Sequence, residues 1–392
     1  MKGFLQIWEG HQTGRQRGEH KELWVDMVFA HEATLSLILP ELRAAGGPAL
    51  PVDRLFFVLD HFAPPSSGPF ADIVREVRSF CAEHSIPLQM LEGIGHRLMM
   101  ESDRIRPGDL VIGADSHTTT IGGKGAAGIG LGSTDVLSVL LTGRVWLRRP
   151  LVAAICLTGA LPAGVEARDA AMSLLRHHGQ AGFLGQVMEY RLDETTSLEP
   201  DERSVLTNLC VEMGAVTALA IESSSSAPAD RQVAINLNKL TPLVAQPGAP
   251  DDVVPAETLS DIRPDWVIIG SCAAGSLDDL HRAAVVLDGR QVAEGVGLLV
   301  TPGSNRVYKQ AMADGTLRRL VDAGATILNP SCGACGGIDK GIPAVDDVVL
   351  STAPRNYASR QRAGSRVYLA SASVAAATAL TGRIADPREV LS

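Results

Sequence analysis

Aromatic side chains and long apolar runs are both scarce in this 392-residue sequence. Phe, Trp and Tyr make up only 4% of the residues although 45% are hydrophobic, so the core must consist mainly of Ala, Val, Leu and Ile. This composition is typical of helices packed on buried parallel strands. No segment approaches the roughly 18 uninterrupted apolar residues that a membrane-spanning helix needs. The sequence therefore predicts an α/β protein that does not cross a membrane.

An export signal is also missing, and cysteines are few. Residues 1–22 lack the apolar stretch that marks a secretory signal. Six cysteines in a chain of this length do not form a disulfide framework, and a protein without an export signal is expected in a reducing compartment. We therefore expect a cytoplasmic protein whose cysteines are available to bind metal.

A strongly basic surface is not expected either. The formal net charge is −9, with acidic and basic residues mixed along the chain, which argues against nucleic acid and against an anionic membrane surface as partners. The length favours roughly two or three domains. We expect α/β domains over 1–150 and 261–392, with a shorter α/β domain over 151–260 between them.

Strand-like and helix-like runs alternate in the first and last thirds of the chain. Residues 54–60 and 109–115 read as strands on either side of a helix over 70–84, which indicates a parallel sheet. The same alternation returns after Pro264. Open parallel sheets place their ligand sites at the carboxyl ends of the strands, so polar residues at these ends are the candidate functional residues.

Three cysteines follow predicted strands in the last third, namely Cys272, Cys332 and Cys335. By itself the C-x-x-C of the last two could be a redox pair or half a zinc site. Three thiolates are one ligand short of a closed zinc site or an ordinary four-cysteine cluster, which leaves a position open for substrate. Cys81 lies in an amphipathic helix pattern and Cys156 in an apolar strand pattern, and both are assigned to the core.

Other polar groups also occur at predicted strand ends. Asp60 beside His61 could fix the imidazole tautomer, although such a pair can be a surface turn. The run Asp115, Ser116, His117 could equally be a helix cap. Weaker candidates are His96, the pair Asn208 and Glu212 at helical spacing, and Arg355 with Arg360, whose guanidinium groups suit carboxylates or form an exposed basic loop.

In combination, these motifs resemble a known family. Their order is DH, GxGH, GADSHTTT…GSTD, TNxxxExG, GSC, CGxC, RNxxxR and YLAS, and it covers residues 25–387. This order resembles the large subunit of the aconitase superfamily, closest to its 3-isopropylmalate dehydratase and homoaconitase branch. The resemblance implies three α/β/α domains around a cluster-containing cleft, with no swivel domain, and a 4Fe-4S cluster held by Cys272, Cys332 and Cys335.

The resemblance also assigns roles to the other candidates. The family's proton-transfer and water-binding positions match Asp60, His61, His96, Asp115, His117 and Glu212, with His61 the donor to the departing hydroxyl. Substrate-binding positions match His31, Ser116, Asn208, Arg355 and Arg360. The implied reaction removes water from a hydroxy di- or tricarboxylic acid. The serine marker GSSREH of the swivel domain is absent, so we expect a separate small subunit to supply the catalytic serine and further carboxylate-binding residues.

Several positions depart from the family pattern. Ala273 and Ala274 follow Cys272 where Thr-Asn is usual, Pro354 stands where an asparagine is expected, and Glu32 stands where Asp is common. Two alternatives therefore remain open. One is a non-catalytic, cluster-binding or iron-sensing paralogue. The other is a dehydratase of a natural-product pathway with the same fold and a single metal ion bound by the three thiolates.

Overall fold

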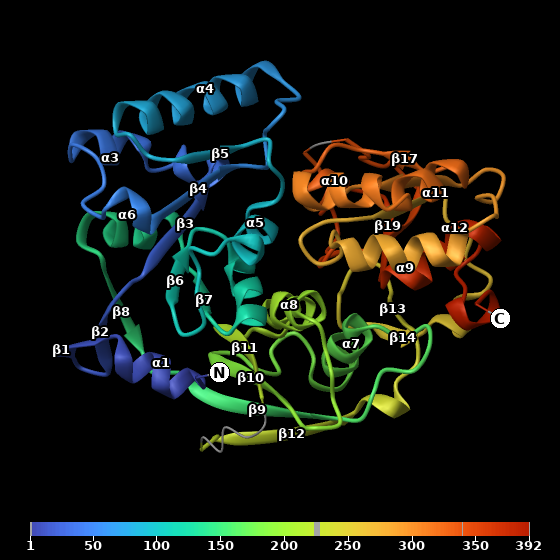
Figure 1. Cartoon of the computed structure of the whole chain (residues 1–392), viewed down its shortest axis with the longest axis horizontal. Helices are drawn as coiled ribbons and strands as arrows, with labels where there is room; N and C mark the ends of the chain where they lie inside the picture. Colours follow the sequence, from blue (N-terminus) through green and yellow to red (C-terminus); the bar gives the residue numbers. More distant parts are fainter. Residues whose placement is uncertain (1, 223–227, 339, 392) are drawn as a thin grey trace. The chain divides into compact units, whose positions relative to one another are not determined.

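The computed structural model describes residues 2–222, 228–338 and 340–391 (Figure 1). Its contacts divide into two compact units. The first comprises Met1–Leu91, Leu98–Thr158 and Phe183–Ile235, and the second comprises Glu92–Arg97, Gly159–Gly182 and Asn236–Ser392. Both contain parallel sheets and helices, which confirms the α/β class. The expected division at 150 and 260 into three domains stays a prediction.

A parallel sheet forms the centre of the first unit. Its strand order is β5 (Leu88–Met90), β4 (Leu55–Leu59), β3 (Met27–His31), β6 (Leu110–Gly113) and β7 (Ala127–Gly130). Every residue of β3, β4 and β6 is buried. Strands covered on both faces read as continuous apolar runs, and this explains the sequence patterns at 54–60 and 109–115.

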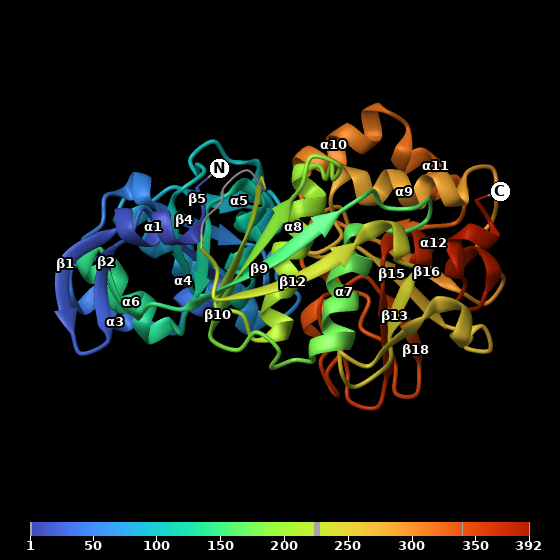
Figure 2. The same ribbon diagram turned by 90° about the horizontal axis from the view of Figure 1, so that it is seen from below.

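Two further sheets complete this unit. One has the order β11 (Thr217–Glu222), β10 (Gln186–Leu192), β9 (Leu151–Thr158), β12 (Arg231–Asn236), and β9 and β12 lie side by side in Figure 2. The other is antiparallel, with the order β1 (Gln12–Arg17), β2 (His20–Trp24), β8 (Arg144–Arg148).

Helices cover these sheets. They are α1 (Phe4–Gly10), α2 (Glu32–Leu35), α3 (Leu39–Ala44), α4 (Gly68–Glu83), α6 (Ser133–Thr142) and α8 (Pro200–Leu209), while α5 (Gly95–Glu101) begins in the second unit. Short 3₁₀ helices are η1 (Val52–Arg54), η2 (Ser116–Lys124) and η3 (Cys210–Met213). Helix α4 shows why such segments fold: the Ser67 hydroxyl caps its start, and Val74, Val77 and Cys81 recur at helical spacing on its buried face.

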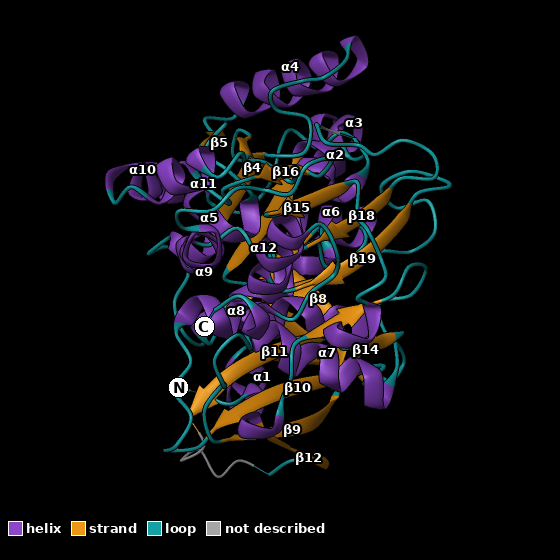
Figure 3. Cartoon of the chain, turned by 90° about the vertical axis from the view of Figure 1, so that its right-hand side faces the viewer, coloured by secondary structure: helices purple, strands orange, loops and turns teal. Residues whose placement is uncertain are grey.

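The second unit is built on one mixed sheet. Its order is β14 (Val253–Pro255), β13 (Leu243–Ala245), β19 (Arg366–Ala370), β18 (Val348–Ser351), β15 (Trp266–Ile269), β16 (Gly297–Val300) and β17 (Thr326–Ile327). From β19 to β17 all neighbours are parallel, whereas β13 pairs antiparallel with β14 and β19. Figure 3 shows β15, β18 and β19 side by side.

The helices of this unit include one whose small side chains allow close packing. They are α7 (Ala167–His178), α9 (Leu277–Leu287), α10 (Asn305–Ala313), α11 (Thr316–Asp322) and α12 (Ala372–Thr381), with 3₁₀ helices η4 (Leu237–Lys239), η5 (Ala256–Leu259), η6 (Gly333–Gly336) and η7 (Pro387–Glu389). The alanine-rich α12 is buried over residues 372–379 and packs on α9 and β15. Throughout the described ranges, no helix has the length and apolar character needed to cross a membrane.

Candidate active site

The carboxyl ends of three neighbouring strands gather polar residues in the first unit. Strand β3 ends at His31, β4 is followed by Asp60 and His61, and β6 by Asp115. The sheet order β4-β3-β6 makes these strands direct neighbours. Parallel strands present their carboxyl ends at one edge, so residues far apart in the sequence meet there.

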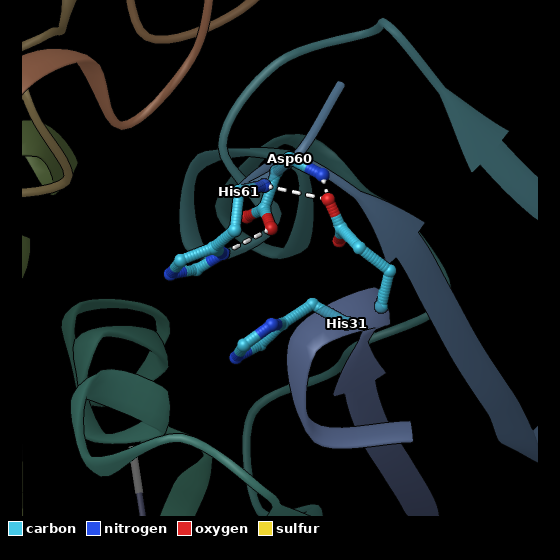
Figure 4. A group of neighbouring side chains, drawn as sticks. His31, Asp60 and His61 are labelled. Carbon is cyan, nitrogen blue, oxygen red and sulfur yellow. Dashed lines mark hydrogen bonds and ion pairs between the residues drawn. The ribbon is translucent and has the colours of Figure 1, made fainter. Parts of the chain in front are cut away.

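Two histidine rings are stacked at this edge (Figure 4). The His31 and His61 ring centroids are 4.0 Å apart, and the ring planes are inclined by 14°. The Asp60 carboxylate lies 2.6 Å from Nδ1 of His61 and is almost fully buried. An imidazole that donates its Nδ1 proton to a carboxylate has its basic lone pair on Nε2, which makes it suited to proton transfer.

Glu32 holds the loop that carries this pair, and the sequence analysis gave it no role. Its carboxylate is fully buried and accepts hydrogen bonds from the backbone N–H groups of Asp60 at 3.1 Å, His61 at 2.9 Å and Phe62. Burial raises the pKa of Glu32, and the charge of Asp60 raises it further. Its position directly after a strand that ends in histidine could have indicated a functional role. A glutamate in the first turn of a helix is common, however, so the position alone did not single it out.

The ligand atoms of His31, Glu32, Asp60 and His61 all lie within 4.8 Å of one another, close enough for a metal ion. The geometry nevertheless favours proton transfer. Imidazole lone pairs lie in the ring plane, so two nearly parallel stacked rings do not direct their lone pairs at one ion. The Glu32 oxygens already accept three backbone hydrogen bonds.

A second set of polar groups extends from the end of β6. The Asp115 carboxylate accepts a hydrogen bond from the backbone N–H of His117 at 2.7 Å, which caps η2, and its other oxygen lies 3.4 Å from Nε2 of His31. Nε2 of His117 lies 3.3 Å from a carboxylate oxygen of Glu212. Carboxylates and imidazoles therefore alternate from Glu212 to His31 within the first unit.

Asn208 and Ser116 take different places around this set. Asn208 is fully buried in α8 and donates its amide N–H to the Thr120 hydroxyl at 2.9 Å, whereas Ser116 is exposed at the start of η2. Helix α8 ends at Leu209, so Glu212 lies in the 3₁₀ turn η3 and not on the same α-helix as Asn208. The expectation of a shared α-helical face is corrected accordingly.

The remaining candidates lie in the second unit. His96 is buried at the start of α5, and its segment is fixed to the loop after β16, where the Ile94 N–H donates to the Gly303 carbonyl at 2.9 Å. Cys272 follows β15, Cys332 and Cys335 follow β17, and Arg355 follows β18. These loops lie at the carboxyl ends of parallel strands of one sheet, in which β18 is next to β15 and β16 separates β15 from β17.

Within the described residues none of the three cysteines forms a disulfide; Cys272 is buried and the other two are half-buried. The Cys272 loop requires glycine at its start: Gly270 has φ +145°, and a Cβ there would lie 2.5 Å from the Thr301 carbonyl oxygen. Ser271 follows with φ +81°. This strained turn brings the cysteine directly off the end of a central strand.

The two arginines differ in their contacts. Arg360 donates from Nε to the Cys335 carbonyl at 3.0 Å, so its side chain is hydrogen-bonded to the loop that carries Cys332 and Cys335. Arg355 is half-buried just beyond β18. Before Arg360, Ser359 adopts φ +73°, a conformation that glycine takes without strain.

Comparisons with known proteins agree with these motifs. The model of the aconitase family (aconitate hydratase) matches residues 5–227 and 255–382. The 3-isopropylmalate dehydratase large subunit 1 of Methanopyrus kandleri is 34% identical, over 94% of each chain. The homoaconitase large subunit of Thermus thermophilus is 36% identical, over 97% of this chain and 96% of its own. Among solved structures, aconitase X of Thermococcus kodakaraensis superposes with a TM-score of 0.56 at 12% identity, covering 86% of this chain and 84% of its own.

Proposed function

This chain belongs to the aconitase family, and we propose that it is the large subunit of an iron-sulfur hydro-lyase acting on a 3-isopropylmalate-like hydroxy acid. The observation that supports the proposal most is the Asp60–His61 pair directly after β4. A carboxylate oxygen of Asp60 lies 2.6 Å from Nδ1 of His61. Relatives that match nearly the full length are named 3-isopropylmalate dehydratase and homoaconitase large subunits, which are hydro-lyases.

The three cysteines fit an iron-sulfur cluster by their chemistry. Thiolates are the preferred ligands of such clusters, and Cys272, Cys332 and Cys335 lie in loops at the carboxyl ends of β15 and β17, which flank β16 in one sheet. Cys81 and Cys210 do not qualify as readily, because burial raises the pKa of each thiol to about 12. We propose that the three cysteines hold the cluster, which when bound supplies a Lewis acid for the substrate hydroxyl.

The chain's own side chains would carry the protons and bind the substrate. His61, oriented by Asp60, is the proposed donor to the departing hydroxyl, and Glu32 fixes the loop that carries both. His117, between Asp115 and Glu212, is the proposed second proton carrier, with His96 assigned to the same group by family resemblance. Arg355 and Arg360 are proposed to bind substrate carboxylates, since a guanidinium group matches a carboxylate in bidentate fashion.

His31, Ser116 and Asn208 are proposed to contact the substrate. His31 supports this role by its stacking on His61, which places a second imidazole beside the proton donor. A separate small subunit is proposed to supply the catalytic serine, because the relatives carry the name large subunit and the serine marker of the family is absent from residues 1–392.

Anaerobic reconstitution with iron and sulfide tests the proposal. We expect about four irons per chain, as in a cubic cluster, and dehydration of 3-isopropylmalate or homocitrate only after a small subunit is added. Comparing kcat/KM for the two acids then assigns the substrate class. Absence of iron-sulfur absorption, or full activity without the small subunit, would contradict the proposal. Iron without matching sulfide would favour a single metal ion held by the three thiolates.

A further inference from the structure

A buried arginine in the middle segment contacts the chain where it leaves the parallel sheet of the second unit. Arg168 lies in the first turn of α7 and is only 3% exposed. Its Nη1 donates to the Thr352 carbonyl at 2.5 Å, and its Nη2 donates to the Ala353 carbonyl. These carbonyls belong to the two residues directly after β18 and directly before Pro354 and Arg355.

The same network reaches the first cysteine loop. The Thr352 hydroxyl donates to the Gly270 carbonyl and accepts from the Gly270 N–H, both at 2.9 Å. The Ser271 hydroxyl donates to the Thr352 carbonyl at 3.3 Å, the same carbonyl that Arg168 contacts. Arg168 therefore acts on the end of β15, immediately before Cys272, through residues at the end of β18.

Three positions within these loops carry no side-chain hydrogen-bonding group in this chain. Ala273 and Ala274, directly after Cys272, are almost completely buried and have no polar side-chain atoms, and Pro354 has no backbone N–H. Buried carbonyl groups need donors. The planar guanidinium group of Arg168 supplies two donors, one for the Thr352 carbonyl and one for the Ala353 carbonyl.

Acidic side chains lie near Arg168 and oppose the effect of its burial. Burial lowers the pKa of Arg168, whereas the neighbouring Glu166, Asp279 and Asp169 act in the opposite direction, as does Cys272. Glu166 is itself engaged at the start of α12, where it accepts from the Ser373 N–H at 2.7 Å. The arginine is thus a buried cation among acidic groups that are fixed by the backbone.

We propose that Arg168 is a positioning residue that fixes two loops at once, the arginine loop after β18 and the Cys272 loop after β15. The role rests on the proposed function, in which these loops bind a substrate carboxylate and the cluster. Arg168 does not touch either ligand in this scheme. It fixes the position of the backbone segments that carry Arg355 and Cys272.

Hydrogen exchange of the cluster-free protein tests this inference independently of activity. Arg168→Lys keeps the charge, but an ammonium group lacks the planar fork, and Arg168→Gln also removes the charge. We expect faster exchange over 268–274 and 351–356 in both variants, with unchanged exchange in α10. Arg191→Lys is the matched control, because Arg191 is a buried arginine of the first unit paired with Glu189 at 2.7 Å.

The reconstituted holoenzyme provides the second readout. For Arg168→Lys we expect iron loss to a chelator to be about 10–100-fold faster, as for other groups that orient metal ligands, and KM to rise by more than kcat falls. Uniformly faster exchange throughout the second unit, or unchanged exchange at both loops, would overturn the inference. If the wild type takes up no iron, the proposed function fails, while the exchange data still decide the role of Arg168.

Discussion

At the scale of single residues, the structure turns several separate candidates into a connected set. Asp60 orients His61, His61 stacks on His31, and His31 lies beside Asp115. The His61–His31 and His31–Asp115 contacts join residues from different strand ends, so only the Asp60–His61 pair can be read from sequence spacing. Glu32 stabilises the arrangement by accepting three backbone hydrogen bonds from the loop after β4.

Glu32→Gln should lower kcat with little change in KM. The amide replaces one acceptor oxygen by a donor, so at least one backbone N–H of the loop is left without its acceptor and His61 loses its fixed position. We expect kcat to fall about 10–100-fold, the usual cost of removing a group that orients a catalytic site. Steady-state kinetics of the reconstituted enzyme measure this effect.

Glu22→Gln serves as the control for that variant. Glu22 is a buried glutamate of β2 in the same unit and accepts from the Thr13 hydroxyl at 2.6 Å, away from the strand ends. It should keep the wild-type kcat. An unchanged kcat for Glu32→Gln, or an equal loss for Glu22→Gln, would remove the special role of Glu32.

At the scale of elements, helix starts in the second unit carry buried acidic residues. Ser276 and Asp279 form a capping box at the start of α9: the Asp279 carboxylate accepts from the Ser276 N–H at 2.9 Å and from its hydroxyl. Asp169 caps α7 in the same way and accepts a further bond from the Leu243 N–H at 2.8 Å. Burial raises the pKa of Asp169 to about 8.

Asp279→Asn should change how stability depends on pH. Burial raises the pKa of Asp279 to about 7 from its ordinary 3.8, so between these values the folded state binds a proton that the unfolded state releases. The stabilisation from this group is therefore present below about pH 4 and is lost as pH rises towards 7. The slope for one proton is at most about 1.4 kcal/mol per pH unit.

Urea unfolding of the two proteins across this range measures the effect. The free energy of unfolding of the wild type minus that of Asp279→Asn should decrease from pH 4 to 7 and then level off. The asparagine can still accept from the Ser276 N–H, so the cap itself is largely kept. A difference that is constant with pH, or that increases, would show that Asp279 titrates in its ordinary range.

At the scale of the whole molecule, the fold separates three loop cysteines from two buried ones, while the sixth, Cys156, lies in β9. Cys272, Cys332 and Cys335 lie in loops at the carboxyl ends of β15 and β17, which flank β16 in one sheet. Cys81 and Cys210 are buried in the first unit, where desolvation raises the pKa of each thiol to about 12. A thiol that keeps its proton at neutral pH is a poor metal ligand.

Serine substitutions should separate these groups. Cys272→Ser, Cys332→Ser and Cys335→Ser should each lose most of the iron bound on anaerobic reconstitution, because a hydroxyl does not replace a thiolate ligand. Cys210→Ser should retain it. Iron and sulfide analysis of the purified proteins measures the outcome, and circular dichroism confirms folding. Iron loss in the Cys210 variant, or its retention in the other three, would contradict the assignment.

Local pattern was enough to predict the individual elements and the α/β class. The continuous apolar run at 55–59 is a buried parallel strand, and the strand at 266–269 is followed by the helix at 277–287. Such elements can be predicted because the periodicity of a strand or helix depends only on residues close together in the sequence. The family and its motif residues were also recognisable from sequence order alone, and membership is confirmed. The roles of those residues remain predictions.

Tertiary structure alone decided which residues meet. Sheet order determines that His31 lies beside His61 and Asp115, and that the Cys272 loop shares the edge with the loops after β17 and β18. The sequence assigned no role to Glu32 or Arg168, because their hydrogen bonds are with backbone groups that the fold brings from distant parts of the chain. Sequence periodicity indicates which face of each helix or strand is buried. Strand order, in contrast, is set by packing among many elements at once, and the contacts between strand ends follow from that order.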